Sequence, residues 1–305
     1  MTELAVDIAG LRLRNPTMLA SGILNETGRS MLEVARAGAG ALVTKSVSAD
    51  EREGHANPCI VEVEGGIINA MGLPNPGAEV YAAELDVARG GDVPVIASVI
   101  GGDGEEIAGV AKTLAAAGAD AIELNLSCPH AKGLGAEIGS TPQAVREVCQ
   151  TVKRSVSVPV FAKLTPNTTS IGSLARAAEE GGADGIVAIN TLKAMAICPD
   201  LRRPVLSNGI GGLSGPAIKG VGVRAVYEIS DEVRIPVIGV GGVSDARDAL
   251  EYIMAGATAV QIGTAIRSRG VAVFSDICEG LERFMDENGC SSLSELVGVA
   301  HEGRT

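Results

Sequence analysis

Apolar residues fall along the chain in short runs, and most of these runs follow a helix-like stretch. The recurring unit is an alanine-rich segment that ends at a glycine, passes through small or acidic residues and enters a β-branched run. The clearest copies are ARAGAGALVTK (35–45), AAAGADAIELN (115–125), EEGGADGIVAIN (179–190) and IMAGATAVQIG (253–263). Glycine at this point takes the left-handed conformation that ends a helix. We therefore predict tight turns from outer helices into parallel strands.

Eight apolar runs have the length and composition of buried strands. Three of them, VPVIASV (93–99), VPVFAKL (158–164) and IPVIGVG (235–241), have a proline near their start, where its missing N–H is best tolerated. The predicted strands cover 17–20, 41–46, 94–99, 121–127, 159–164, 185–190, 236–240 and 259–263. The predicted helices cover 30–37, 105–117, 142–154, 170–181, 215–229, 244–255 and 270–287. This alternation predicts an α/β protein with a closed (β/α)8 TIM barrel.

Two segments interrupt the alternation, residues 47–78 after the second predicted strand and residues 191–214 after the sixth. Both follow the C-terminal end of a strand, which is the end where barrel active sites form. Long loops there are usually functional, although harmless insertions are the alternative. No linker divides the chain, so we expect residues 1–305 to form a single domain.

Composition narrows the possible partners and locations. Apolar residues make up 46% of the chain and aromatic residues 2%, which fits strands buried on both faces by Val, Ile, Leu and Ala. A net charge of −12 argues against nucleic acid as a partner. The six cysteines include no CxxC pair, so we expect no metal or iron–sulfur site in this chain. We also predict a cytoplasmic protein without a signal peptide or membrane span.

Polar residues stand where the predicted strands end. They are Ser21, Lys45, Ser98, Asn125 with Cys128, Lys163, Asn190 with Thr191, Gly241 with Gly242, and Gly263 with Thr264. With only three histidines and no carboxylate cluster, this set gives little support to Ser-His-Asp or metal-assisted chemistry.

Glycine-rich segments end the last two predicted strands, IGVGGVSD (238–245) and QIGTAIRS (261–268), and a third, NGIGGLSGP (208–216), precedes a helix. Such loops hold phosphate groups through bare backbone N–H groups in many barrels, although simple tight turns are the alternative. A phosphate site beside two lysines favours FMN or a sugar phosphate. A lysine near a flavin would stabilise the charge of its reduced form.

Cys128 differs from the other cysteines because it lies at a strand exit, in LNLSCPHAKGLG. Pro129 ends the strand, and a loop rich in Gly and Lys follows. A thiol there is a candidate general base or nucleophile. The alternative is a small buried apolar residue, as most free cysteines are.

Five separated segments resemble those of the dihydroorotate dehydrogenases, in the order of that family. They are IINAMGLPNPG, NLSCPHAKGLG, FAKLTPN, AINTL and NGIGGLSGPAIKG, and the resemblance runs from about residue 5 to about residue 285. It implies an FMN enzyme that oxidises dihydroorotate to orotate in de novo pyrimidine (UMP) biosynthesis.

The resemblance also implies residue roles. Cys128 matches the base that removes the C5 proton of the substrate. The positions that match orotate contacts are Lys45, Asn69, Met71, Gly72, Leu73, Asn125, Asn190 and Thr191. The positions that match FMN contacts are Ser21, Lys45, Ser46, Asn125, Lys163, Ile189, Gly215, Gly241, Gly242, Gly263 and Thr264. His130 stands where many members have a substrate-binding Asn, so we assign it no role.

Cys128 and the lack of an N-terminal extension differ from the membrane-associated class 2 of the family, which has Ser as its base. The stretches CPHAKGLGAEIG and LSNGIGGLSGPAIKG are more similar to class 1B than to class 1A. Class 1B implies a homodimer that associates with a second subunit carrying FAD and an iron–sulfur cluster, which passes electrons to NAD. Three alternatives stay open. They are a flavin barrel acting on another dihydropyrimidine, a flavin-free sugar-phosphate barrel with Lys163 as its Schiff base, and a non-catalytic assembly partner.

Overall fold

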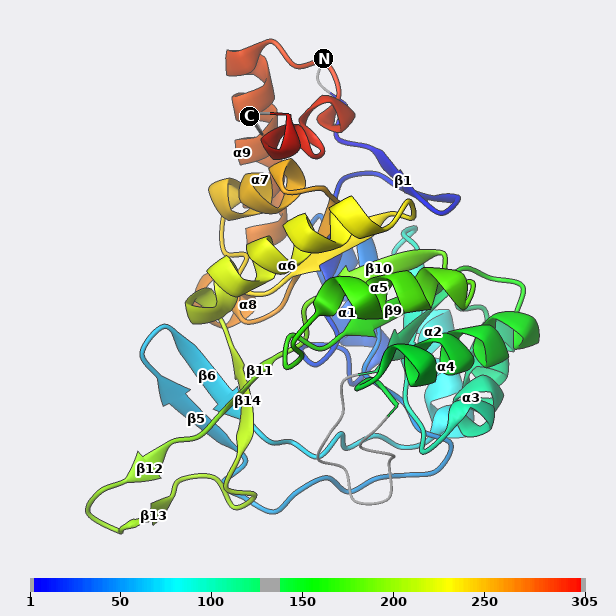
Figure 1. Cartoon of the computed structure of the whole chain (residues 1–305), viewed down its shortest axis with the longest axis vertical. Helices are drawn as coiled ribbons and strands as arrows, with labels where there is room; N and C mark the ends of the chain where they lie inside the picture. Colours follow the sequence, from blue (N-terminus) through cyan, green and yellow to red (C-terminus); the bar gives the residue numbers. More distant parts are fainter. Residues whose placement is uncertain (1–2, 127–137, 303–305) are drawn as a thin grey trace.

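A closed barrel of eight parallel strands forms the centre of the protein (Figure 1). The computed structural model describes residues 3–126 and 138–302. The barrel strands are β3 (Thr17–Leu19), β4 (Ala41–Val43), β7 (Val95–Val99), β8 (Ala121–Asn125), β9 (Val160–Leu164), β10 (Gly185–Ala188), β15 (Val237–Val240) and β16 (Ala257–Ile262). Strand β9 pairs with β10 and β16 pairs with β3, which closes the ring. The predicted (β/α)8 barrel is confirmed, because every predicted strand overlaps one of these.

Helices surround the barrel. They are α1 (Gly28–Arg36), α2 (Ala78–Arg89), α3 (Gly104–Ala116), α4 (Pro142–Ser155), α5 (Ile171–Glu180), α6 (Lys219–Glu232), α7 (Ala246–Met254), α8 (Ala265–Arg269) and α9 (Val273–Asn288), with a 3₁₀ turn, η1 (Pro216–Ile218), before α6. Side chains of Thr27, Asp103, Thr141, Ser170 and Asp245 cap α1, α3, α4, α5 and α7, as short strand-to-helix loops favour. The glycines of the recurring unit, at 38, 118, 182 and 256, all have positive φ, which confirms that prediction.

Helix α2 was not among the predicted helices. Its sequence, AEVYAAELDVAR, follows the Gly- and Pro-rich segment, whose composition hid the start of a helix. The helix nevertheless buries Tyr81, Leu85 and Ala88, which stand at helical spacing. It is the outer helix that connects β4 with β7.

A short N-terminal hairpin closes the end of the barrel where the strands begin. Strands β1 (Val6–Ile8) and β2 (Leu11–Leu13) pair antiparallel. Their Ile8 and Leu13 join one apolar cluster with inward-facing residues of the barrel, such as Phe161 and Ile238. A larger apolar cluster lies between the strands and the helices. The sequence analysis did not predict this hairpin.

The two segments that interrupt the alternation form sheet structure rather than irregular loops. Strands β5 (Ile60–Val63) and β6 (Gly66–Asn69) come from the first segment, and β11 (Leu192–Ala194) and β14 (Gly211–Ser214) from the second. They form one antiparallel sheet in the order β11-β14-β6-β5, and β12 (Ile197–Cys198) pairs with β13 (Arg203–Pro204) beyond it. These strands project from the open end of the barrel (Figure 1).

The two ends of the described chain meet at the opposite side of the molecule, beside α9 (Figure 1). Two 3₁₀ turns, η2 (Leu293–Leu296) and η3 (Val299–His301), complete the chain. The backbone of Glu3 bonds to Ser291 and Leu293. Within residues 3–126 and 138–302, no helix is long and apolar enough to cross a membrane.

Candidate active site

The barrel interior changes from apolar to polar along its axis. Near the hairpin β1–β2 it contains the apolar cluster of Ile8, Leu13 and their neighbours. Two residues farther along four strands, where the same strand face points inward, the side chains are polar. They are Ser98, Glu123, Lys163 and Gln261, and none is more than 5% exposed. The buried polar side chains are therefore concentrated near the end of the barrel where the strands finish.

A chain of hydrogen bonds joins five of the polar strand ends. Ser46 Oγ lies 2.9 Å from Ser98 Oγ and 3.4 Å from Ser21 Oγ. Asn125 Nδ2 donates to Ser46 Oγ at 3.0 Å, and Asn190 Nδ2 donates to Asn125 Oδ1 at 3.2 Å. The structure thus brings Ser21, Ser46, Asn125 and Asn190 together, from four different strands. Their hydroxyl and amide groups can bind a polar heterocycle on several edges.

Lys163 is held by two residues that the sequence analysis did not select. Its Nζ donates to Glu123 Oε1 at 3.2 Å and to Gln261 Oε1 at 3.1 Å. The sequence signal was a single polar residue inside an otherwise apolar run, in AIELN and AVQIG. A strand that is buried on both faces tolerates a polar side chain only where that side chain has a hydrogen-bonding or ionic partner.

The glycine-rich loops meet backbone to backbone. A side-chain carbon added at Gly242 would lie 2.7 Å from the carbonyl oxygen of Gly215. Tyr252 Oη donates to the carbonyl of Gly241 at 2.7 Å, and Ser244 Oγ donates to that of Gly242 at 3.2 Å. In a trans peptide the N–H points opposite to the carbonyl. The N–H groups that follow Gly241 and Gly242 therefore point away from Tyr252 and Ser244.

The remaining predicted FMN positions border these loops. Thr264 Cγ2 lies 3.5 Å from the position of a side-chain carbon added at Gly215. Ile189 Cγ1 lies 3.5 Å from the same point at Gly241, and Ile189 itself is buried. Gly263 faces Ala20, the residue before Ser21. The structure therefore collects the predicted glycines around one end of the barrel.

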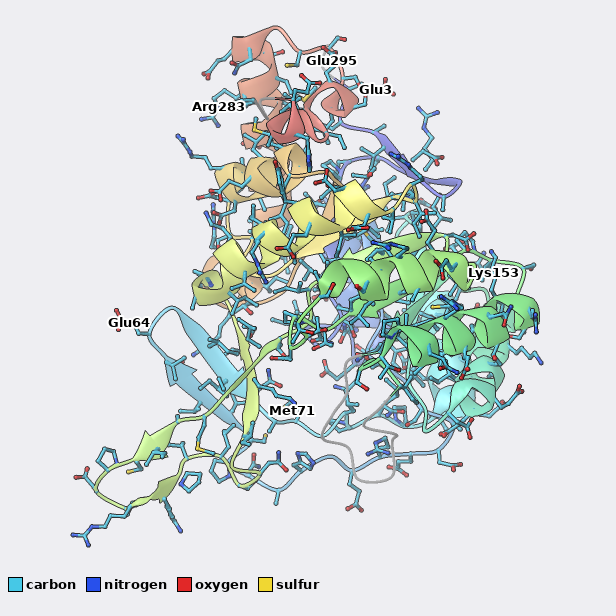
Figure 2. All side chains as sticks on the ribbon, in the orientation of Figure 1. Glu3, Glu64, Met71, Lys153, Arg283 and Glu295 are labelled. Carbon is cyan, nitrogen blue, oxygen red and sulfur yellow. The ribbon has the colours of Figure 1, made fainter. Side chains whose placement is uncertain are left out.

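The predicted substrate positions in the two interrupting segments fall into two groups. Asn69 Nδ2 donates to the carbonyl of Gly212 at 3.4 Å, and Gly212 packs directly against Thr191, so these meet where β6, β14 and the end of β10 converge. Met71, Gly72 and Leu73 lie in the loop after β6. Met71 stands at the end of the barrel from which the hairpins project, far from Glu3 and Glu295 (Figure 2).

The Met71–Leu73 loop is held by the segment before β5. The backbone N–H of His55 donates to the Met71 carbonyl at 2.9 Å, and Met71 Sδ lies 3.5 Å from Cys59 Sγ. Gly72 packs against His55 so closely that a side-chain carbon there would lie 2.7 Å from its backbone nitrogen. Positive φ at Gly72 and Leu73 turns the chain sharply at this point.

Lys45 is engaged by a residue that no sequence pattern suggested. Its Nζ donates to Glu26 Oε1 at 2.9 Å, and the Lys45 side chain is 12% exposed while that of Glu26 is 59% exposed. The Glu26 carboxylate therefore pairs with this lysine from the solvent side. Cys128 and His130 lie outside the described residues.

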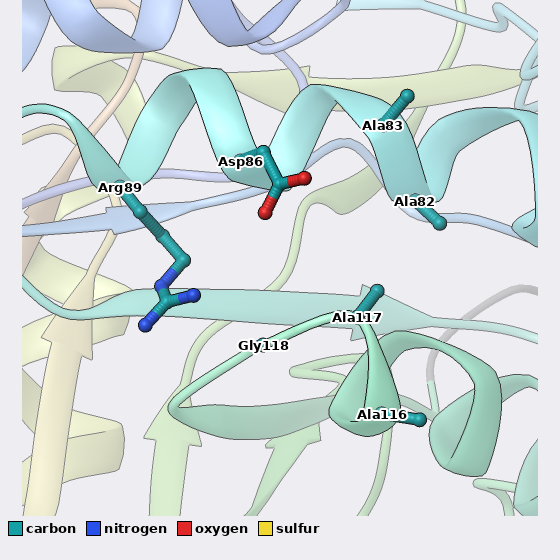
Figure 3. Close-up of a pocket in the computed structure, with 7 residues that line it drawn as sticks. All are labelled: Ala82, Ala83, Asp86, Arg89, Ala116, Ala117 and Gly118. Carbon is teal, nitrogen blue, oxygen red and sulfur yellow. The ribbon is translucent and has the colours of Figure 1, made fainter.

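A shallow hollow on the outside of the barrel is not part of this site. It lies between the C-terminal ends of α2 and α3, and its lining is alanine and glycine together with Asp86 and Arg89 (Figure 3). Outer helices run opposite to the strands, so their C-terminal ends lie at the end of the barrel where strands begin. Over the described ranges, no group of three His, Cys, Asp or Glu side chains forms a metal site.

Residues 3–285 match the family model described as dihydroorotate dehydrogenase. A protein of Methanosarcina mazei is 52% identical over 297 residues, which cover 97% of this chain and 94% of that protein. A protein of Methanocaldococcus jannaschii is 48% identical over 98% of both chains, and one of Thermoplasma acidophilum is 51% identical over 98% and 99%. All three are named dihydroorotate dehydrogenase B (NAD(+)), catalytic subunit.

Proposed function

The chain belongs to the dihydroorotate dehydrogenase family, and we propose that it is the catalytic subunit of an NAD-linked enzyme that oxidises dihydroorotate to orotate in pyrimidine biosynthesis. The observation that carries the proposal is the meeting of three glycine loops and a buried, paired lysine at one end of the barrel. That combination suits a flat ring with a phosphate tail.

The residues fit FMN. Backbone N–H groups of the loops at Gly215, Gly241–Gly242 and Gly263–Thr264 would hold its phosphate. Lys163 and the chain of Ser21, Ser46 and Asn125 would bind the ring, and Ile189 would pack against it. These residues would hold a group that supplies the hydride acceptor for C6 of the substrate. A side-chain carbon at Gly242 would fill the space between the loops, which supports a role for bare backbone there.

Substrate binding is assigned to a second set of side chains. Lys45 would pair with the carboxylate of dihydroorotate, and Asn69, Asn125, Asn190 and Thr191 would bind its amide edges. The Met71–Leu73 loop would cover the ring. In the described structure Asn125 already bonds to Asn190, which keeps both amides at the site.

Cys128 is assigned as the base that takes the C5 proton. The thiolate, and not the neutral thiol, can remove this proton, so the rate of flavin reduction should rise with pH. Replacing it by Ala should slow flavin reduction at least ~10²-fold, the lower range for general-base catalysis. Orotate binding should change little, because the thiol acts on a proton and does not hold the ring. Near wild-type bleaching in stopped flow would return Cys128 to a structural role.

The partner and the setting complete the proposal. Electrons would leave the flavin through a second subunit that carries FAD and an iron–sulfur cluster, because this chain has no CxxC motif for a cluster of its own. We further propose a homodimer of single-domain chains in the cytoplasm, where scattered single cysteines stay reduced.

A visible spectrum followed by anaerobic addition of dihydroorotate tests the proposal. The purified chain should be yellow, should bleach with dihydroorotate, and should prefer orotate to uracil. On its own it should reduce an artificial dye but not NAD. A colourless protein that does not take up added FMN would refute the proposal, and a preference for uracil would favour a dihydropyrimidine enzyme.

A further inference from the structure

A closed triangle of hydrogen bonds lies inside the barrel, behind the polar strand ends. Lys163 Nζ donates to Glu123 Oε1 at 3.2 Å and to Gln261 Oε1 at 3.1 Å, and Gln261 Nε2 donates to Glu123 Oε2 at 2.6 Å. Strand β16, which carries Gln261, stands opposite β8, which carries Glu123, in the eight-stranded ring. The triangle therefore spans the interior and fixes the ammonium group from both sides.

Stability does not explain this triangle. Glu123 is 0% exposed, Gln261 1% and Lys163 5%, so both charges are removed from water. Such removal costs several kcal/mol per ion, and apolar replacements of a buried pair are often neutral or stabilising. The layer beneath is already apolar, with Phe161 and Val187 facing inward. A continuation of that packing would have filled the barrel, so the charges indicate a functional demand.

The lysine is the member of the triangle that faces the site. It is more exposed than either partner, and its register partner on β8 is Asn125, which belongs to the chain of hydrogen bonds described above. An ammonium group has three N–H donors. Glu123 and Gln261 accept two of them, which leaves one N–H donor for a ligand.

We propose that Glu123 and Gln261 are positioning residues that hold Lys163 against the flavin ring, and that the Glu123 carboxylate lowers the reduction potential of bound FMN. The inference rests on the proposed function. A bare ammonium beside the pyrimidine edge would strongly favour the reduced, negatively charged flavin. Glu123 offsets that charge while leaving the N–H in place, so the lysine acts as a fixed donor more than as a full positive charge.

Glu123→Gln tests the charge, because it keeps the size of the side chain and an acceptor oxygen for Lys163. In the flavin-loaded protein, reduced FMN should bind at least tenfold more tightly relative to oxidised FMN than in the wild type. For a two-electron couple that ratio is an upward shift of about 30 mV. Gln261→Leu leaves the ion pair but removes one anchor, and should weaken FMN binding about tenfold with a smaller change in potential.

Thr17→Val is the matched control. Thr17 is also fully buried on a barrel strand, but its hydroxyl bonds to Asn15, away from the site. Its substitution should lower stability and leave the potential and the FMN affinity unchanged. If the control shifts the potential as Glu123→Gln does, general loosening of the barrel is the cause and the inference fails.

The potentials are measured by dye-coupled titration of the flavin spectrum, without dihydroorotate. A Glu123→Gln ratio within twofold of wild type, about 9 mV, would overturn the inference. If that variant does not fold, the double variant Glu123→Gln/Lys163→Met decides, since it removes both charges. Its potential should lie below that of the wild type, and a value at or above it would overturn the inference. A wild type that binds no FMN would instead refute the proposed function and this inference with it.

Discussion

Replacing Gly242 by alanine probes the contact between the two glycine loops. Gly242 has a φ of +73°, and a side-chain carbon there would lie 2.7 Å from the Gly215 carbonyl oxygen and 3.1 Å from Lys219 Cβ. The Gly215 carbonyl accepts the N–H of Ile218 at the start of η1, so it cannot turn aside without opening that turn. The loops must therefore move apart.

The size of the effect follows from this geometry. A left-handed φ costs a non-glycine residue roughly 1–2 kcal/mol, and overpacking costs a further ~1–3 kcal/mol. Ordinary contact begins at 3.4 Å, so 3.4 minus 2.7 gives a separation of about 0.7 Å. Backbone donors displaced by that distance lose good hydrogen bonds to a phosphate, and each bond to a charged group contributes about 1.5–3 kcal/mol. Loss of one such bond predicts FMN binding weaker by about 10- to 100-fold.

Gly289→Ala provides the matched control. Gly289 ends α9 with a φ of +70°, and an added side-chain carbon would meet nothing within 4 Å. It shares the backbone cost of Gly242→Ala but not the collision. The assay is quenching of FMN fluorescence by the apoprotein, with thermal unfolding in parallel. Both variants should lose stability, and only Gly242→Ala should lose affinity. An affinity for FMN within threefold of wild type in Gly242→Ala would refute the reasoning.

Three further outcomes follow from named contacts. Tyr252→Phe removes the hydrogen bond to the Gly241 carbonyl and should weaken FMN binding in the same fluorescence assay. Tyr81→Phe is its control, because it loses an equally buried hydrogen bond to the Asn25 carbonyl. It should lower stability by about 1–3 kcal/mol and leave FMN binding unchanged. Burial raises the pKa of the Cys149 thiol from 9.0 to about 12. The stability that the neutral thiol contributes is therefore present below pH 9 and is lost as the pH rises toward 12. In urea unfolding above pH 9, the wild type should lose up to ~1.4 kcal/mol per pH unit more than Cys149→Ala. Glu26→Gln should tighten orotate binding up to about fivefold by releasing Lys45, the limit set by a partly exposed ion pair, and an unchanged or weaker dissociation constant would contradict this.

The barrel was predictable because each local signal agreed with the others. The glycines at 38, 118, 182 and 256 end helices at positive φ, and a strand follows each within a few residues. Runs of apolar residues then indicate which segments are strands. The four-stranded sheet was missed although the segment IVEVEGGIIN carries a strand, a turn and a strand. Its strands are short and pair with a segment about 145 residues away, so most of their stabilisation is not local.

The site was predictable where chemistry stands at strand ends, and less so inside the strands. Lys45, Asn125 and Asn190 follow apolar runs, which marks them as facing the open end of a barrel. Their partners depend on which strands become neighbours or face each other across the ring. Glu26 meets Lys45 only because the loop after β3 passes beside the end of β4.

Glu123 and Gln261 show how a sequence can still reveal such partners. Each lies two residues before a polar or glycine strand end, on the face that period-two alternation turns inward. A charged residue on that face cannot stay unpaired, because a buried charge without a partner is prohibitively unfavourable. Lys163, also inward-facing, is a cation that can satisfy Glu123. The rule that buried charges occur in compensated groups therefore predicts a lysine–glutamate pair from two strand sequences, and only the closed ring decides that the Gln261 amide from the opposite wall completes it.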